Sequence, residues 1–186
     1  MFRSAPTALP RLIMLLAFAL LLGGCTCAGP TARPIQVGLD PELRSAQFRT
    51  IEVDLVFVQE NQLSLWRDKD MIDYFSGGDS LRRDESRKTT LVFTPGGATD
   101  QSYGVERPQL EQIGQWIKEG ATHLFVMAKL PEHERIGRRS GPADPRRQSV
   151  ALSGCAWDEA GGEHQDIRVT VRRGRVRGTP SGPAGQ

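Results

Sequence analysis

The sequence lacks the residue groupings that carry most enzyme and metal chemistry. Its 186 residues include only three histidines, His123, His133 and His164, and three cysteines. No histidine has a second histidine or a cysteine at the spacing of a metal-binding motif. Ser153 precedes a glycine and Cys155 but does not stand in a nucleophile elbow. We therefore predict no catalytic group, no metal site and no cofactor, and we expect that the protein is not an enzyme.

A hydrophobic run long enough to remain in a membrane is also missing. The apolar stretch from Leu12 to Leu22 has 11 residues, whereas a transmembrane helix needs about 20. Arg3 and Arg11 supply positive charge at its N-terminal side, and two glycines follow it. This order is typical of a secretory signal peptide, so we expect residues 1–24 to be removed.

The signal ends in Leu22-Gly23-Gly24-Cys25, which resembles the bacterial lipobox. In that family the cysteine thiol receives a diacylglycerol, the chain is cut before the cysteine, and the new amine is acylated, commonly with palmitate. The resemblance implies a lipid on Cys25. Thr26 follows instead of aspartate and resembles the outer-membrane sorting pattern, which implies an outer-membrane lipoprotein facing the periplasm. The alternative is an ordinary cleaved signal with a cysteine nearby.

An excess of charge of one sign is absent from the expected mature chain. The whole sequence has 24 basic and 22 acidic residues. Arg3 and Arg11 are lost with the signal, which contains no acidic residue, so 22 residues of each sign remain. This balance gives no overall electrostatic attraction to nucleic acid, and we expect no nucleic-acid partner.

Cysteines are too few for a disulfide framework. Once Cys25 carries lipid, only Cys27 and Cys155 remain. In an oxidising compartment these two could form a disulfide. Alternatively, Cys27 lies at the membrane and Cys155 is buried, and both alternatives stay open.

The composition along the chain predicts one domain between two irregular ends. Residues 25–35 contain alanine, glycine, threonine and two prolines and are expected to form a lipidated flexible tether. Residues 36–178 form the expected domain, which is long enough to bury a core. Residues 179–186 are rich in proline and glycine and are expected to form a disordered tail.

Hydrophobic periodicity predicts a domain dominated by strands. The strongest alternation is that of Ile51, Val53, Leu55 and Phe57, with Glu52 and Asp54 on the other face. Further strands are expected at 88–94, 122–130 and 148–152, and a hairpin at 167–176, whereas residues 98–107 read as a loop. The other expected elements are a short helix capped by Asp70, a single turn capped by Asp79 and a longer helix at 108–119. The pattern favours a mainly β (α+β) antiparallel β-sandwich with one short and one longer helical insertion; an α/β arrangement is the alternative.

Four aspartates, Asp68, Asp70, Asp73 and Asp79, stand close together in the sequence. Their spacing matches no calcium loop, so we interpret them as helix caps and solvated residues.

Three aromatic residues follow the first strong strand. Core packing is the expected role of these aromatic residues, and a partner-binding patch is the alternative; they are Trp66, Tyr74 and Phe75.

Two stretches are rich in arginine. One lies in the long loop at 131–147, and the other lies in the C-terminal hairpin. Either could contact anionic headgroups or an acidic protein, or could be a solvated loop and a charged edge strand. The arginines of the loop are Arg135, Arg138, Arg139, Arg146 and Arg147, and those of the hairpin are Arg168, Arg172, Arg173, Arg175 and Arg177.

The order of these features resembles the outer-membrane lipoprotein of type VI secretion systems (TssJ-like). A lipobox and short tether precede the strand 51–57; a segment with Leu63 and Leu65 and a helical stretch ending at Phe75 follow it. A later strand reaches Pro95-Gly96, and 124–128 resembles the penultimate strand of that family.

The resemblance implies a small β-sandwich that anchors an envelope-spanning secretion assembly. It would bind a protein partner in the envelope, the periplasmic end of an inner-membrane component, through the segment after Glu60 and the loop from Pro131. The expected partner-binding residues are Leu63, Leu65, Trp66, Arg135, Arg138 and Arg139. The alternative is a free-standing lipoprotein that binds an envelope polymer or lipid.

The lipid anchor can be tested by changing Cys25→Ser and fractionating the cells. Because each buried methylene of an acyl chain adds about 0.8 kcal/mol to membrane binding, the wild-type protein should sediment with the membranes and the variant should become extractable with salt. An unchanged, salt-resistant membrane fraction would contradict the prediction.

Overall fold

The computed structural model describes residues 31–43, 49–130, 143–152 and 167–180. The predicted lipid and disulfide positions, Cys25, Cys27 and Cys155, lie outside these residues. So do the three loop arginines expected to bind a partner, which are Arg135, Arg138 and Arg139. Within the described part of the chain, no helix has the length and apolar character needed to cross a membrane.

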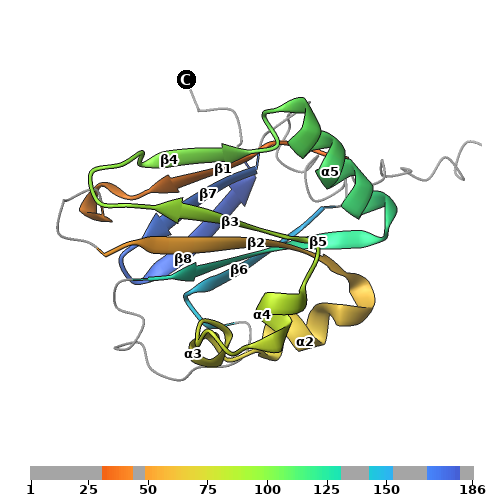
Figure 1. Cartoon of the computed structure of the whole chain (residues 1–186), viewed down its shortest axis with the longest axis horizontal. Helices are drawn as coiled ribbons and strands as arrows, with labels where there is room; N and C mark the ends of the chain where they lie inside the picture. Colours follow the sequence, from red (N-terminus) through yellow and green to blue (C-terminus); the bar gives the residue numbers. More distant parts are fainter. Residues whose placement is uncertain (1–30, 44–48, 131–142, 153–166, 181–186) are drawn as a thin grey trace, which may run out of the picture.

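The fold is the predicted β-sandwich, built from two four-stranded sheets (Figure 1). Sheet A has the strand order β4-β1-β7-β8, and sheet B has the order β3-β2-β5-β6. Every strand pair is antiparallel except β1 with β7, which is parallel. The strands are β1 (Ile35–Leu39), β2 (Ile51–Gln59), β3 (Lys88–Phe93), β4 (Asp100–Tyr103), β5 (Ala121–Lys129), β6 (Arg147–Ala151), β7 (Ile167–Arg172) and β8 (Arg175–Pro180).

Sheet A departs from the prediction in three places. β1 begins at Ile35, inside the expected tether, and its Ile35, Val37 and Leu39 alternate into the core. β4 occupies part of the expected loop 98–107 and pairs with β1. β8 runs through Pro180, past the expected start of the tail at residue 179. These strands are short or polar, and their pairing with distant segments determines them more than local propensity does.

β2 lies in the middle of the molecule and divides it into layers. Its residues Ile51, Val53, Leu55 and Phe57 face sheet A and belong to the main core. Its Val56 and Val58 face the other way, into a second apolar cluster beneath the short helices. The protein therefore has three layers, sheet A, sheet B and a helical layer, and sheet B carries buried apolar residues on both faces.

The longer helix α5 (Arg107–Lys118) closes one end of the sandwich (Figure 1). The two buried residues of the helix are Ile113 and Trp116, and the partly buried Ile117 also packs against the main core. The Trp116 ring lies 4.8 Å from the Phe57 ring, centroid to centroid, and 6.3 Å from that of Tyr103. The helix therefore ties β2 of one sheet to β4 of the other.

Gly104 allows α5 to approach sheet A closely. Its φ of +91° lies in the left-handed region, and a Cβ placed there would lie 2.7 Å from Ile113 Cδ1. Only glycine satisfies both the backbone angle and the contact.

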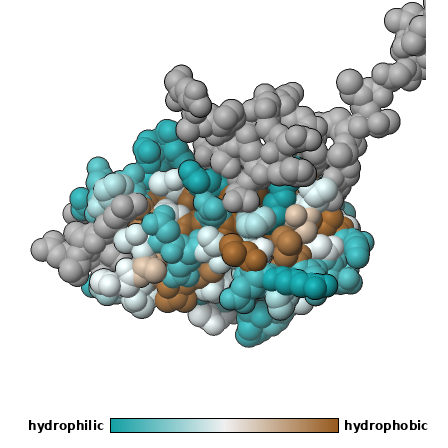
Figure 2. Space-filling model, turned by 90° about the horizontal axis from the view of Figure 1, so that it is seen from above, coloured by the Kyte–Doolittle hydropathy of each residue, from teal (hydrophilic) through white to brown (hydrophobic). Residues whose placement is uncertain are grey.

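Figure 2 shows the molecule from above relative to Figure 1. The described part of the surface in this view carries small hydrophobic patches among hydrophilic residues, so it is not a continuous apolar surface.

Replacing Trp116→Ala should lower the free energy of unfolding by about 3–5 kcal/mol, because it leaves a cavity where both sheets meet α5. Urea denaturation of the mature-length chain with Cys25→Ser would measure this. Gln115→Ala, on the exposed side of the same helix, is the matched control and should change stability by less than about 0.5 kcal/mol. Equal effects of the two substitutions would contradict this account of the core.

Candidate functional site

The connection between β2 and β3 is a helical insertion, residues 60–87, that covers the outer face of sheet B (Figure 1). It contains the 3-10 helix η2 (Glu60–Gln62) and the short helices α2 (Leu63–Asp68), α3 (Met71–Tyr74) and α4 (Ser80–Asp84). The sequence predicted α3 and the turn of α4 but not α2. Helices this short are not stable alone, so the contacts that hold them in place determine the site.

Two aspartates start the helices, as predicted. Asp70 Oδ1 accepts hydrogen bonds from the backbone N–H groups of Ile72 (2.7 Å) and Asp73 (3.3 Å) at the start of α3. Asp79 Oδ1 accepts one from the N–H of Arg82 (2.9 Å) at the start of α4, and Asp79 also forms an ion pair with Lys69. These carboxylates satisfy the free N–H groups of each first turn, which confirms their interpretation as caps.

The described residues contain no group of three or more His, Cys, Asp or Glu placed to hold a metal ion. His123, on β5, lies 3.6 Å from Glu60 Oε2 through its Nδ1 and contacts the Thr122 hydroxyl. Burial lowers the pKa of His123, and the neighbouring Glu60 opposes that shift. His123 therefore has polar partners within the sheet and its neighbourhood.

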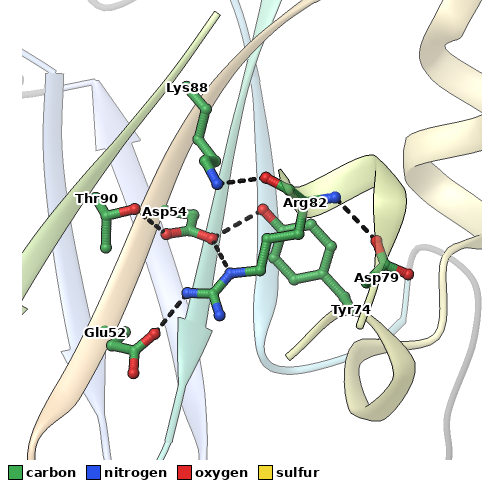
Figure 3. Close-up of polar contacts among 7 residues, drawn as sticks. All are labelled: Glu52, Asp54, Tyr74, Asp79, Arg82, Lys88 and Thr90. Carbon is green, nitrogen blue, oxygen red and sulfur yellow. Dashed lines mark hydrogen bonds and ion pairs between the residues drawn. The ribbon is translucent and has the colours of Figure 1, made fainter. Parts of the chain in front are cut away.

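A buried polar cluster fixes α3 and α4 to β2 (Figure 3). Asp54 is fully buried, and its two carboxylate oxygens accept hydrogen bonds from Tyr74 Oη (2.9 Å), Arg82 Nε (2.8 Å) and Thr90 Oγ1 (2.6 Å). A second guanidinium nitrogen of Arg82 donates to Glu52 Oε2 at 2.5 Å. One side chain of β2 therefore holds both helices and β3 at once.

The donors of this cluster keep their protons at physiological pH. Burial, followed by the negative charge of Asp54, raises the pKa of Tyr74 above its ordinary value. Burial alone would lower the pKa of Arg82, but the hydrogen bonds to Asp54 and Glu52 raise it overall. Arg82 also lies over the Phe75 ring, 4.7 Å from its centroid. Tyr74 and Arg82 are thus fixed donors, suited to holding structure.

The other attachment of the insertion comes from β6. Arg147 donates hydrogen bonds through one guanidinium nitrogen to the backbone carbonyl oxygens of Trp66 (2.7 Å) and Lys69 (2.9 Å) at the C-terminal end of α2. Only 5% of Arg147 is exposed, and this burial lowers its pKa. A cation at this end of a helix meets the free carbonyl groups and the negative end of the dipole.

The position of the neighbouring Arg146 also differs from the one predicted for the arginines of the loop 131–147. It is fully buried and forms a two-pronged ion pair with Asp144, with nitrogen–oxygen distances of 2.9 and 2.7 Å. The sequence placed Arg146 and Arg147 in a basic loop open to solvent or to an anionic partner. Both instead belong to the interior, where paired charges are tolerated.

The surface of the insertion contains one of the predicted partner-binding residues. Leu63 and Trp66 are buried in the second apolar cluster, so they cannot touch a partner directly, and the indole N–H of Trp66 has no hydrogen-bond acceptor among the described residues. Leu65 is 52% exposed. It borders an open hollow whose other lining residues are Ser64, Asp68, Lys69, Asp70 and Asp73.

Sequence reasoning missed the residues that position this surface. Asp54 stands on the polar face of an alternating strand, and no local signal shows that Arg82 and Tyr74 fold over it. The one available signal was the apolar Val56 and Val58 on the same face, which indicated that part of that face is covered.

Asp54→Ala should lower the free energy of unfolding by about 3 kcal/mol, because Arg82 and Tyr74 lose their shared buried acceptor. Chemical denaturation would measure the change. Asp84→Ala is the matched control, because it removes a carboxylate that pairs with Arg83 at the exposed surface, and it should leave the denaturation midpoint unchanged. A stable Asp54→Ala protein would contradict the importance of the cluster.

Comparison with known proteins gives solved structures but no family model and no curated relative. The type VI secretion lipoprotein TssJ1 from Pseudomonas aeruginosa is 15% identical, with a TM-score of 0.49, and the match covers 84% of this chain and 99% of that one. Serratia marcescens Lip, described as a membrane-bound component of the type VI secretion system, is 12% identical, with a TM-score of 0.48, covering 82% and 98%.

A third structure, the C-terminal domain of the type VI secretion protein TssM from EAEC, is 10% identical, with a TM-score of 0.46, covering 79% of this chain and 99% of that one. These structures include lipoproteins of the kind that the sequence resembles. At such identities and TM-scores the likeness concerns the course of the chain alone.

Proposed function

We propose that this protein is a lipid-anchored envelope component of a type VI secretion assembly. It sits at the outer membrane, faces the periplasm and binds the periplasmic part of an inner-membrane component through its helical insertion. The observation that carries the proposal is the exposed Leu65, held on a helix that is fixed to sheet B. The lipobox at Cys25 and the sequence resemblance supply the membrane and the type of assembly.

The insertion is held in the shape that a partner would meet. α2 is attached to β6 through Arg147, and α3 and α4 are attached to β2 through Asp54. Because these contacts are made within the free chain, little order has to be gained on binding. Such preorganisation favours affinity, since binding otherwise costs the ordering of loops and side chains.

The chemistry of the surface specifies the kind of partner. Leu65 offers an apolar side chain to a pocket on another protein, and carboxylates surround it. Asp68 is exposed, and Lys69 is neutralised by Asp79. The fitting partner therefore has an apolar pocket bordered by lysine or arginine, because apolar anchors supply binding energy and complementary charges supply orientation.

The test is a pull-down of the tagged full-length lipoprotein from solubilised membranes of cells that carry a type VI secretion cluster. The wild-type protein should recover an inner-membrane secretion component. Leu65→Glu should reduce that recovery about tenfold, as expected when a central apolar anchor is replaced by a charge. Stability should not change, since the side chain is exposed.

The matched control is Val105→Glu, which places the same charge at a residue that is 65% exposed in the connection between β4 and α5. It should leave the recovery unchanged. The proposal fails if the wild-type protein recovers no inner-membrane component, if Leu65→Glu has no effect, or if both variants lose the partner equally.

A further inference from the structure

The hairpin of β7 and β8, residues 167–180, contains five arginines and no acidic residue. Val169, Val171 and Val176 point into the core, so the alternate residues point away from it. The register pairs Arg172 with Arg175 and Thr170 with Arg177, and paired residues lie on the same side of a sheet. Four of the arginines therefore share the outer side of sheet A. We call them the arginine face: Arg168, Arg172, Arg175 and Arg177.

Among the described residues, the arginine face is only partly neutralised by its surroundings. Arg172 and Arg175 lie directly opposite each other, an arrangement that is unfavourable for like charges. The ion pair of Arg172 is with Asp40, at 3.4 Å. Within the described part of the chain, neither Arg175 nor Arg177 has a side-chain hydrogen bond or an ion pair. An open hollow lies at this end of the hairpin, lined by Asp40, Glu42 and residues 172–175.

Protection of a sheet edge does not explain the whole arrangement. Charged residues on an edge strand prevent unwanted pairing with other chains, and β8 is such a strand. However, Arg168 and Arg172 belong to β7, which lies between β1 and β8 and has no free edge. The positive charge thus extends over the surface of the sheet as well as along its edge.

Among the residues that the structure describes, the same side of sheet A lacks the apolar centre of a protein interface. On β1 the outward residues are Gln36 and Gly38, and on β4 they are Asp100 and Ser102. Protein–protein interfaces have an apolar core within a polar rim. A face of arginine, glutamine, serine and threonine side chains, with Asp100 as the one carboxylate among these outward strand residues, fits a polar, negatively charged surface instead.

We propose that the arginine face docks on anionic phospholipid headgroups. Guanidinium groups bind phosphate oxygens with two parallel hydrogen bonds, and basic side chains near an anionic leaflet add attraction residue by residue. This rests on the proposed function in one respect, the lipid on Cys25. The chain from that lipid enters the domain at β1, beside β7, where Ile35 pairs with Ile167 and Arg168 donates to Gln36 Oε1 at 3.2 Å.

The test uses the mature-length chain with Cys25→Ser, so that no acyl chain contributes. Binding is measured by co-sedimentation with vesicles of phosphatidylcholine and phosphatidylglycerol, and with vesicles of phosphatidylcholine alone. The protein should bind only the anionic vesicles, and binding should fall as salt screens the charges. Arg175→Gln/Arg177→Gln should weaken binding at least about tenfold.

The matched control is Arg83→Gln/Arg107→Gln, which removes the same charge from exposed arginines outside sheet A and should bind as the parent does. Circular dichroism confirms that each variant is folded. The proposal is overturned if the parent does not bind anionic vesicles, if both double variants lose binding equally, or if binding is insensitive to the arginine face. None of these results affects the pull-down through Leu65, so the two proposals can fail separately.

Discussion

A carboxylate that is removed from water must be stabilised by neighbouring donors, and Asp54 shows how much structure this requirement can determine. Its position on β2, on the side away from sheet A, would cost several kcal/mol without partners. Tyr74, Arg82 and Thr90 supply them, and each comes from a different element of the chain. The backbone between them has to fold over sheet B for these contacts to form. The short helices owe their place to this requirement and to the cap that Arg147 provides, since their own length cannot stabilise them.

The elements that were predicted correctly are those with a clear local pattern in the sequence. The alternation of β2, the apolar run of β5 and the caps Asp70 and Asp79 are local signals. β1 and β4 could not be recognised, because a strand of four or five residues with polar members depends on pairing partners about 65 and 130 residues away in the chain. Nothing in the sequence indicates which charged residues are buried. Asp54 and Arg147 look like solvated residues in the sequence, and only the fold supplies the partners that make their burial tolerable.

The two proposed surfaces lie on opposite sides of the sandwich. The helical insertion covers the outer side of sheet B, and the arginine face belongs to the outer side of sheet A. Their chemistry also differs, since one combines an apolar side chain with carboxylates and the other is polar and mainly basic. A membrane contact through sheet A would leave Leu65 directed away from the bilayer, toward a partner arriving from the periplasm. Both contacts could then exist at once, as an adaptor requires.

The position of β1 has a mechanical consequence. The strand lies between β4 and β7 and is hydrogen-bonded on both sides, and further backbone bonds continue past its ends, from Ile167 N–H to the Pro34 carbonyl and from Asp40 N–H to the Val171 carbonyl. A pull on the segment before Ile35, directed along the strand, stretches both ladders in shear, so many bonds resist together and none can be peeled away singly. If that segment ends in a lipid while the other side of the domain holds a partner, the tension between two membranes enters sheet A through a strand that is hydrogen-bonded on both sides.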